Sequence, residues 1–338
     1  MNGRVILMTT AAALALAAVA SSARADALVD DAKAVVEKAT ARADKWEGPT
    51  SGPKAVAKKT VVYVAGDMRN GGILGVAHGL KEAADVLGWT YREIDGQGTV
   101  SGQASGLSQA IALKPDAIVV GGSDAVQQKA SLDEAAKQGI VIVGWRKSVF
   151  ANVTPNAMEV AKVAAMKAIA DSNGKAGVVV FADSAYAIAI AKGRAMESWI
   201  KKCEGCKVLA FEDTPLADTA NRVPQLTTTL LQQLGPKWTH SLAINDLYYD
   251  SMGPSLQVAG LKGDGDPQNI SAGDGSESAY QRIRDKDYQS ATVPEPLNMQ
   301  GWQLADELNR AFAHEKWSGF VPGVHLVTAA NIAFDGGP

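Results

Sequence analysis

The chain has 338 residues and a formal net charge of −3, and charged residues make up 20% of it. A nucleic-acid partner would call for a basic stripe, so this mildly acidic balance argues against that class of function. A chain of this length is long for one hydrophobic core, and two domains are expected.

Residues 1–25 have the pattern of an export signal peptide. A short basic stretch, Met1–Arg4, precedes an apolar stretch, Val5–Ala20, and Ala23-Arg24-Ala25 resembles a cleavage site. No cysteine stands near that site to carry a lipid, and no second apolar segment has the length of a membrane span. We therefore expect a soluble, exported, periplasmic protein whose mature chain begins at Asp26.

Residues 26–59 are expected to form a helix and a linker ahead of the main fold. Asp26–Trp46 is a charged amphipathic stretch, and Glu47–Pro53 is rich in glycine and proline. We expect an appendage in which the helix lies on the surface.

A strand–loop–helix unit opens the main fold. Thr60–Val64 is a short β-branched apolar run, typical of a strand buried on both faces. The polar, glycine-rich loop Gly66–Gly72 follows it. Apolar residues then recur at helical spacing over Ile73–Leu87, and Gly88 is placed to end that helix.

The loop offers a carboxylate, a guanidinium and an amide, from Asp67, Arg69 and Asn70. It follows the carboxyl end of a buried strand, where open α/β sheets bind their ligands, and this chemistry suits a hydroxyl-rich molecule. Two simpler alternatives stay open, because Asp67 and Arg69 could pair with each other and Asn70 could be a turn residue.

The rest of the chain alternates strands and helices. Further strands are predicted at Thr90–Ile94, Ala117–Val120, Val141–Gly144, Gly177–Phe181, Lys207–Phe211, Ser241–Ile244, Asn269–Ala272 and Ser290–Val293. Helices are predicted near Gly102–Leu113, Ala125–Gln138, from Asn156 to Asp171, up to Lys201, over Val223–Leu234 and near Asn298–Ala313. Repeated β-α-β units predict parallel sheets with helices on both faces. About nine strands favour two doubly wound lobes over one very wide sheet.

The two cysteines, Cys203 and Cys206, lie in one C-x-x-C sequence between a predicted helix and a predicted strand. Half a zinc site or a redox pair would be the alternatives. A zinc site needs four ligands, and no second pair or histidine cluster is present. A redox pair of the thioredoxin type should open a helix. A small loop disulfide in an oxidising compartment is therefore the favoured interpretation.

The sequence patterns of common enzyme sites are missing. There is no G-x-G-x-x-G, no P-loop and no G-x-S-x-G, and the four histidines are scattered. Asp264-Gly265-Asp266 begins like a calcium loop but lacks the later glycine and glutamate. We expect no cofactor, no metal site and no enzymatic activity.

Four short segments at predicted strand ends carry a family resemblance. They are Gly144-Trp145-Arg146, Ala243-Ile244-Asn245-Asp246, Ala272-Gly273-Asp274-Gly275 and Ala291-Thr292-Val293-Pro294-Glu295-Pro296. In this order and spacing the chain resembles the type I periplasmic sugar-binding proteins, the ribose-binding-like group that serves ABC transporters. The resemblance covers Thr60 to about Asn331.

The resemblance implies two lobes joined by three crossing strands, with a sugar between the lobes. The crossings would fall near Thr154, Glu295 and His325. The N-terminal lobe would then comprise residues 60–153 and 296–324, and the C-terminal lobe residues 154–295 and 325–338.

The resemblance also implies ligand positions at Asn70, Arg146, Asn245, Asp274 and Glu295. Relatives often carry an aromatic pair after the first asparagine, where this chain has Gly72 and Ile73, so the stacking surface is expected elsewhere. The proposed ligand-contacting residues are Asp67, Arg69, Asn70, Trp145, Arg146, Asn156, Tyr186, Asn245, Tyr248, Asp274 and Glu295.

Simpler roles remain open for several of these residues. Trp145 could be core, Arg146 could bridge the lobes, and Glu295 could be a hinge residue. Asn245 could cap the helix that follows it, although Asp246 is the better cap and would leave Asn245 free. Asp274 could likewise cap the helix from Ser276. Tyr248 and the adjacent Tyr249 cannot both face a cleft from one helix, so one of them is expected in the core.

The sequence thus predicts a monomeric receptor that captures a monosaccharide or polyol between two lobes and delivers it to a membrane ABC permease. A sensor for a membrane kinase or chemoreceptor is the alternative. A sugar-modifying enzyme that uses Asp274 with Glu295 is a weaker one. A sugar-responsive repressor would need a basic N-terminal helix-turn-helix, and an export signal stands in its place.

Overall fold

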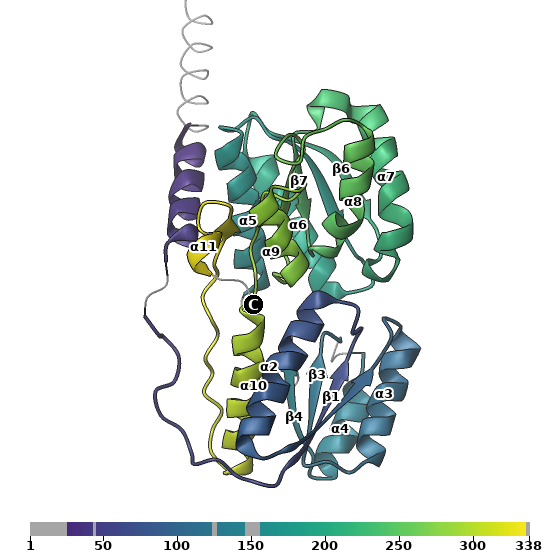
Figure 1. The fold of residues 1–338 in the computed structure, drawn as a ribbon, viewed down its shortest axis with the longest axis vertical. Coiled ribbons are helices and arrows are strands. Elements are labelled where there is room, and N and C mark those ends of the chain that lie inside the picture. Colours follow the sequence, from purple (N-terminus) through teal and green to yellow (C-terminus); the bar gives the residue numbers. More distant parts are fainter. Residues whose placement is uncertain (1–25, 43–44, 124–126, 146–155, 336–338) are drawn as a thin grey trace, which may run out of the picture.

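The computed structural model describes residues 26–42, 45–123, 127–145 and 156–335. They form two α/β lobes stacked along the long axis of the molecule (Figure 1). We call the lower one in that view the N-lobe and the upper one the C-lobe. Each is built on its own mostly parallel sheet, so the predicted fold class is confirmed.

The N-lobe sheet has four parallel strands in the order β2-β1-β3-β4. They are β1 (Thr60–Ala65), β2 (Thr90–Asp95), β3 (Ala117–Gly121) and β4 (Val141–Trp145). Its helices are α2 (Gly71–Leu87), α3 (Val100–Ala112), α4 (Lys129–Lys137) and α10 (Leu297–Phe312). Successive β1 side chains enter opposite cores: Val61 and Tyr63 pack with α2 and α10, and Val62 and Val64 with α3 and α4. The β-branched run is apolar throughout because both faces of the strand are covered.

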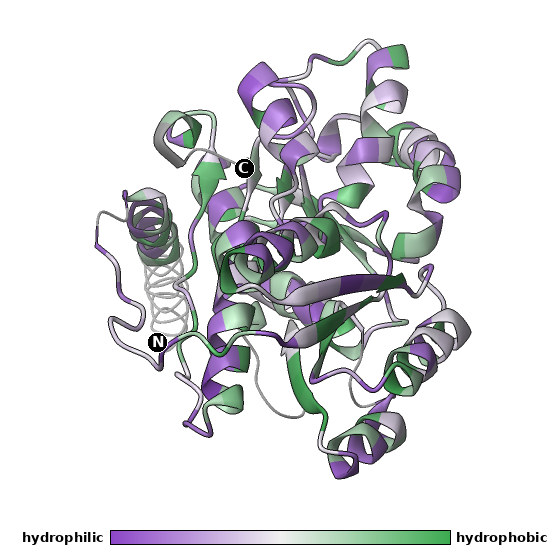
Figure 2. Cartoon of the chain, turned by 60° about the horizontal axis from the view of Figure 1, so that its bottom comes forward, coloured by the Kyte–Doolittle hydropathy of each residue, from purple (hydrophilic) through white to green (hydrophobic). Residues whose placement is uncertain are grey.

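The C-lobe sheet has six strands in the order β10-β9-β8-β7-β5-β6, and only the β9–β10 pair is antiparallel among the described strands. They are β5 (Gly177–Ala182), β6 (Lys207–Asp213), β7 (His240–Ala243), β8 (Gln268–Ser271), β9 (Ala291–Thr292) and β10 (Val327–Thr328). Its helices are α5 (Ala157–Asp171), α6 (Ala187–Lys202), α7 (Thr219–Leu234), α8 (Leu247–Val258), α9 (Glu277–Asp285) and α11 (Ile332–Asp335), with short 3-10 turns η1 (Leu216–Asp218) and η2 (Gly235–Lys237). Figure 2 shows the resulting pattern, with apolar residues concentrated on the central strands and polar residues on the outer helices.

The two sheets share one winding order. In each, the first strand lies between the second and third strands of that lobe, and the remaining parallel strands continue past the third. Such an order places a crevice outside the carboxyl ends of the strands, where connections leave toward opposite faces of the sheet. The loops after β1, β7 and β8 all reach the space between the lobes, as the next section describes.

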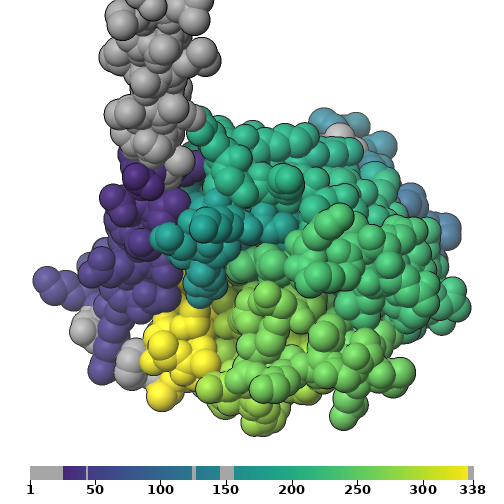
Figure 3. Space-filling model, turned by 90° about the horizontal axis from the view of Figure 1, so that it is seen from above, coloured from purple at the N-terminus to yellow at the C-terminus, as the bar shows by residue number. Residues whose placement is uncertain are grey.

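The N-terminal segment packs against both lobes and is more than a surface appendage. Its helix, residues 26–40, buries Val29, Ala32 and Ala39 in the C-lobe core. The backbone carbonyl of Ala39 accepts from the amide of Leu326 at 2.9 Å. Figure 3 shows this segment, in purple, beside the yellow C-terminal end of the chain.

The linker that follows docks on the N-lobe. Asn309 of α10 accepts from the Val56 amide at 2.9 Å, and the Trp89 indole donates to the Val56 carbonyl at 2.6 Å. Arg310 donates to the Ser51 carbonyl at 2.7 Å. Residues 26–42 and 45–59 therefore form a strap that holds one lobe with its helix and the other with its linker.

The chain also passes between the lobes between β9 and α10 and between α10 and β10. Glu295 lies in the first of these segments and His325 in the second, and the predicted crossing near Thr154 lies outside the described residues. Among those residues, no helix has both the length and the apolar character needed to cross a bilayer.

Candidate ligand-binding site

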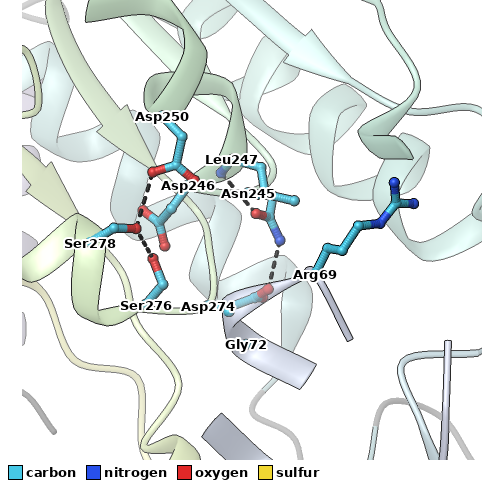
Figure 4. Close-up of a pocket in the computed structure, with 10 residues that line it drawn as sticks. Arg69, Gly72, Asn245, Asp246, Leu247, Asp250, Asp274, Ser276 and Ser278 are labelled. Atoms are coloured by element: carbon cyan, nitrogen blue, oxygen red, sulfur yellow. Dashed lines mark hydrogen bonds between the residues drawn. The ribbon is translucent and has the colours of Figure 1, made fainter. Parts of the chain in front are cut away.

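A small cavity of about 100 Å³ lies between the two lobes (Figure 4). Its walls come from the loop and helix after β1 on one side and from the segments after β7 and β8 on the other. The lining residues are Arg69, Gly71, Gly72, Asn245, Asp246, Leu247, Asp250, Asp274, Ser276 and Ser278. Of the residues proposed from the sequence, the structure brings Arg69, Asn245 and Asp274 to this cavity.

The C-lobe wall is centred on a hydrogen-bonded pair. The Asn245 amide donates to Oδ2 of Asp274 at 2.6 Å, and both side chains are almost fully buried. Oδ1 of Asn245 accepts from the Leu247 amide at 3.0 Å, which fixes which end of the side-chain amide faces Asp274.

The prediction that Asp246 caps the helix after β7 and leaves Asn245 free is wrong. Asp246 makes no side-chain cap hydrogen bond to α8. Its Oδ2 accepts from the Gly275 amide at 2.8 Å, and its Oδ1 accepts from the Gln289 side chain at 2.7 Å. Asp246 instead ties the loop after β7 to the loop after β8, and Asn245 makes the short-range bond to the start of the helix.

The N-lobe wall is the amino end of α2. Asn70 caps this helix, because its Oδ1 accepts from the amides of Gly72 and Ile73 at 2.9 and 3.1 Å. A Cβ atom at residue 72 would overlap Asp274 of the other lobe, and one at residue 71 would lie 2.7 Å from Cβ of Ser276. The two glycines therefore let the C-lobe approach this helix closely.

Asp67 and Arg69 pair with each other. Arg69 donates through Nε and Nη2 to the two Asp67 oxygens at 2.9 and 2.7 Å. The hydrogen bond to Asp67 raises the pKa of the Arg69 guanidinium. The Arg69 side chain is 67% exposed and turned away from Asp274 (Figure 4), so this charge pair lies at the edge of the cavity.

Tyr186 lies close to the other lobe. It directly precedes α6 of the C-lobe, and the Gln103 side chain of α3 in the N-lobe is near its hydroxyl. Burial raises the pKa of the Tyr186 hydroxyl, and the nearby Gln103 side chain opposes part of that shift. The Gln103 side chain is almost fully buried, and sequence reasoning did not identify it.

Both tyrosines of α8 are core residues in this structure. The Tyr248 hydroxyl donates to the Thr214 carbonyl at 2.6 Å, and that of Tyr249 donates to the Ile270 carbonyl at 2.8 Å. Burial raises the pKa of both hydroxyls. Neither ring lines the cavity.

Asn156 and Glu295 lie away from the cavity lining. Asn156 caps α5 by accepting from the Met158 amide at 2.9 Å, and its side chain is exposed. Glu295 is buried at the crossing before α10 and accepts from the Gln300 side chain at 3.2 Å.

Trp145 is the last residue of β4, and its side chain is outside the described part of the structure, as is all of Arg146. Cys203 and Cys206 form a disulfide at the turn between α6 and β6. No group of three or more metal-ligating side chains occurs within the described ranges.

Sequence reasoning missed three polar residues of the C-lobe wall, namely Asp250, Ser276 and Ser278. The Ser278 hydroxyl donates to Asp250 at 3.0 Å and lies 3.0 Å from the Ser276 hydroxyl. The only available signal was the helix start at Ser276, whose hydroxyl caps α9. The cavity wall is thus made of carboxylate, amide and hydroxyl groups, which can exchange hydrogen bonds with a hydroxyl-rich ligand.

Comparisons with known proteins agree with this architecture. The family model described as "Periplasmic binding protein domain" matches residues 61–316. A comparison with curated proteins finds no match.

Solved structures of similar fold include a galactofuranose-binding protein, with 19% identity, a TM-score of 0.71, and coverage of 81% of this chain and 96% of that one. A solute-binding protein of Burkholderia graminis in complex with D-arabinose has 16% identity, a TM-score of 0.73, and coverage of 83% and 99%. One from Bacillus halodurans with bound myo-inositol has 15% identity, a TM-score of 0.71, and coverage of 83% and 98%. Since the family model spans most of both lobes, the chain belongs to the periplasmic binding protein family.

Proposed function

We propose that this protein is an exported, monomeric solute receptor that captures a monosaccharide or polyol between its lobes and delivers it to a membrane ABC permease. The observation that carries the proposal is the buried Asn245–Asp274 pair in a polar cavity between two lobes. The bound D-arabinose and myo-inositol of two structural neighbours point to the same class of ligand.

Binding would proceed by separation and closure of the lobes. Asp274 and Asn245 would accept and donate hydrogen bonds to ligand hydroxyls, while Arg69 and the amino end of α2 would close over the ligand from the N-lobe. A buried carboxylate that loses a hydrogen-bond partner costs about 1–3 kcal/mol or more, so such a wall rejects ligands that lack the matching hydroxyl. Closure would give a permease a surface formed by both lobes.

We further propose that Arg146 contacts the ligand. Its position after the fourth strand matches the arginine of the resembling family, and a guanidinium can donate two parallel hydrogen bonds to adjacent oxygens. We also propose that the ligand is released unchanged, so that the protein has no catalytic role.

The test is a thermal-shift screen with pentoses, hexoses and polyols that includes D-arabinose and myo-inositol, followed by calorimetry on the compounds that raise the melting temperature. Asp274→Ala and Arg146→Ala should each weaken binding at least tenfold without unfolding the protein. Asp287→Ala, at an exposed C-lobe position, is the control and should bind like wild type. Wild-type affinity in Asp274→Ala would refute the site. Recovery of a chemically altered compound would refute the receptor role.

A further inference from the structure

The side chains of Arg282, Gln289 and Asp246 form a hydrogen-bonded relay, in which Asp246 lines the cavity and the other two lie behind it. Gln289, just before β9, accepts at Oε1 from Nε and Nη2 of Arg282 at 3.0 and 2.8 Å. Its Nε2 donates to Oδ1 of Asp246 at 2.7 Å. Gln289 and Asp246 are 1% and 2% exposed, so water does not offer them alternative partners.

The relay has a fixed direction. Arg282 can only donate hydrogen bonds, and an ionised Asp246 can only accept them. The Gln289 amide must therefore present its oxygen to Arg282 and its nitrogen to Asp246. The second oxygen of Asp246 accepts from the Gly275 amide at 2.8 Å, which continues the relay into the loop after β8.

The relay joins the two loops that carry the proposed ligand contacts. Asn245 precedes Asp246, and Asp274 precedes Gly275, so the Asp246–Gly275 bond lies beside the Asn245–Asp274 bond. At its other end, Arg282 is hydrogen-bonded to Asp250, which accepts from Ser278 at 3.0 Å. Asp250 and Ser278 line the cavity, whereas Gln289 does not.

We propose that Gln289 and Arg282 are positioning residues for the ligand site. They hold the loops after β7 and β8 at the spacing that ligand binding needs. This role depends on which atoms of the relay donate and which accept hydrogen bonds, and not only on the volume of the side chains. This inference rests on the proposed function for its effect on affinity, but its effect on loop geometry can be measured without a ligand.

The experiment reverses one link of the relay. Gln289→Glu sets two buried carboxylates side by side, and Asp246→Asn presents an amide nitrogen either to the Gln289 nitrogen or to the Gly275 amide. When both substitutions are combined, the side-chain oxygen at position 246 can accept from Gly275 and the side-chain nitrogen there can donate to the carboxylate at position 289. That carboxylate still accepts from Arg282. The hydrogen bonds of the relay are restored, with the same net charge and nearly the same volume, and only the 3.4 Å bond from the Gln289 side chain to the Ala291 carbonyl is lost.

The first readout is amide hydrogen exchange at Gly275 without ligand. The second is the affinity, from calorimetry, for one compound of a panel of D-arabinose, myo-inositol and other sugars and polyols. That compound is the one that gives wild type the largest thermal shift. Each single variant should speed exchange and weaken binding at least tenfold, and the double variant should recover most of both losses. The matched control is a second glutamine–aspartate pair, in which the Gln281 side chain donates to Asp285 at 2.7 Å on the exposed face of α9. Gln281→Glu and Asp285→Asn should change neither readout.

The inference is overturned if the single variants behave like wild type, or if the double variant is no better than the sum of the singles. Should a single variant fail to fold, a folded double variant supports the relay and an unfolded one refutes it. If wild type binds nothing in the panel, the proposed function fails, and exchange at Gly275 still decides whether the relay positions the loops.

Discussion

The two lobes share the order of their parallel strands but hold their cleft-facing loops in different ways. After β1, Asp67 pairs with Arg69 at the surface. After β5, the corresponding strand of the C-lobe, Asp183 is 1% exposed and accepts from the backbone amides of Ala185 and Leu216, both at 2.8 Å. The first C-lobe loop is thus held by a buried carboxylate, whereas the aspartate of the N-lobe loop pairs with an arginine that solvent screens.

The same contrast appears at the cavity. Asn245, Asp246 and Asp274 of the C-lobe are each buried and hydrogen-bonded to another part of their own lobe or wall. The N-lobe contributes Gly71 and Gly72, which have no side chain, and the exposed Arg69. We infer that the C-lobe presents a preorganised polar surface and that the N-lobe acts chiefly as a close-fitting cover.

The largest expected effect is on the free energy of unfolding, and it should differ between the two aspartates that follow the first strand of each sheet. Asp183→Ala leaves two backbone amides without their carboxylate acceptor in a buried loop, and should lower the free energy of unfolding by about 2–4 kcal/mol. Asp67→Ala removes an ion pair whose Arg69 end is exposed and leaves the Arg69 amide to bond with water instead, so it should cost about 1 kcal/mol or less. Urea denaturation of both variants measures the difference, and equal losses would remove the contrast between the lobes.

A second prediction tests the N-lobe as a cover. In Gly72→Ala the new methyl group meets Asp274 across the cleft, so the lobes should not close fully and the radius of gyration from X-ray scattering should increase. Affinity for a ligand held between the lobes should fall about tenfold, which is about 1.4 kcal/mol. Gly253→Ala in α8, where the nearest side-chain atom is 3.4 Å away, is the control. A scattering curve identical to that of wild type would show that the contact does not limit closure.

The smallest effect concerns acid stability in the C-lobe. Burial lowers the pKa of His240 from its ordinary value of 6.5, while the nearby carboxylates of Asp171 and Asp266 oppose the shift and Lys167 adds to it. Below about pH 6.5 the unfolded chain therefore binds a proton that the folded protein resists, and the free energy of unfolding falls as the pH drops.

His240→Asn should flatten this dependence between about pH 7.5 and about pH 5.5, by at most about 1.4 kcal/mol per pH unit. The comparison is urea denaturation at both pH values, with His78→Asn on the exposed face of α2 as the N-lobe control. Parallel profiles for wild type and His240→Asn would contradict a stability role for the neutral histidine.

Much of the fold followed from local patterns in the sequence. The β-branched runs at Thr60–Ala65 and Gly177–Ala182 are strands, and Gly88 ends α2 in the left-handed conformation. These features depend on residues close in the chain, so periodicity and turn chemistry identify them. The two-residue strand β10 has no such local signal, because only its pairing with β9 defines it.

The site was less predictable because its partners are distant in sequence. Asn245 and Asp246 are both good helix caps, and the choice between them depends on Gly275 and Gln289. Tyr186 and Gln103 approach each other from different lobes, and neither local sequence predicts their proximity. In the N-terminal helix, the side chains that enter the core include Ala32 and Ala39, which a search for large apolar residues overlooks.

The strap has a consequence for the order in which the protein can fold. Its helix is made near the beginning of the chain, yet the Thr40 carbonyl accepts from Asn331, 291 residues later. Contacts of such separation form late, because the intervening chain must be organised before they are gained. Until the last segment arrives, the Ala39 and Thr40 carbonyls lack their partners Leu326 and Asn331, so a nascent or prematurely terminated chain should hold this helix less firmly and expose it more to proteolysis.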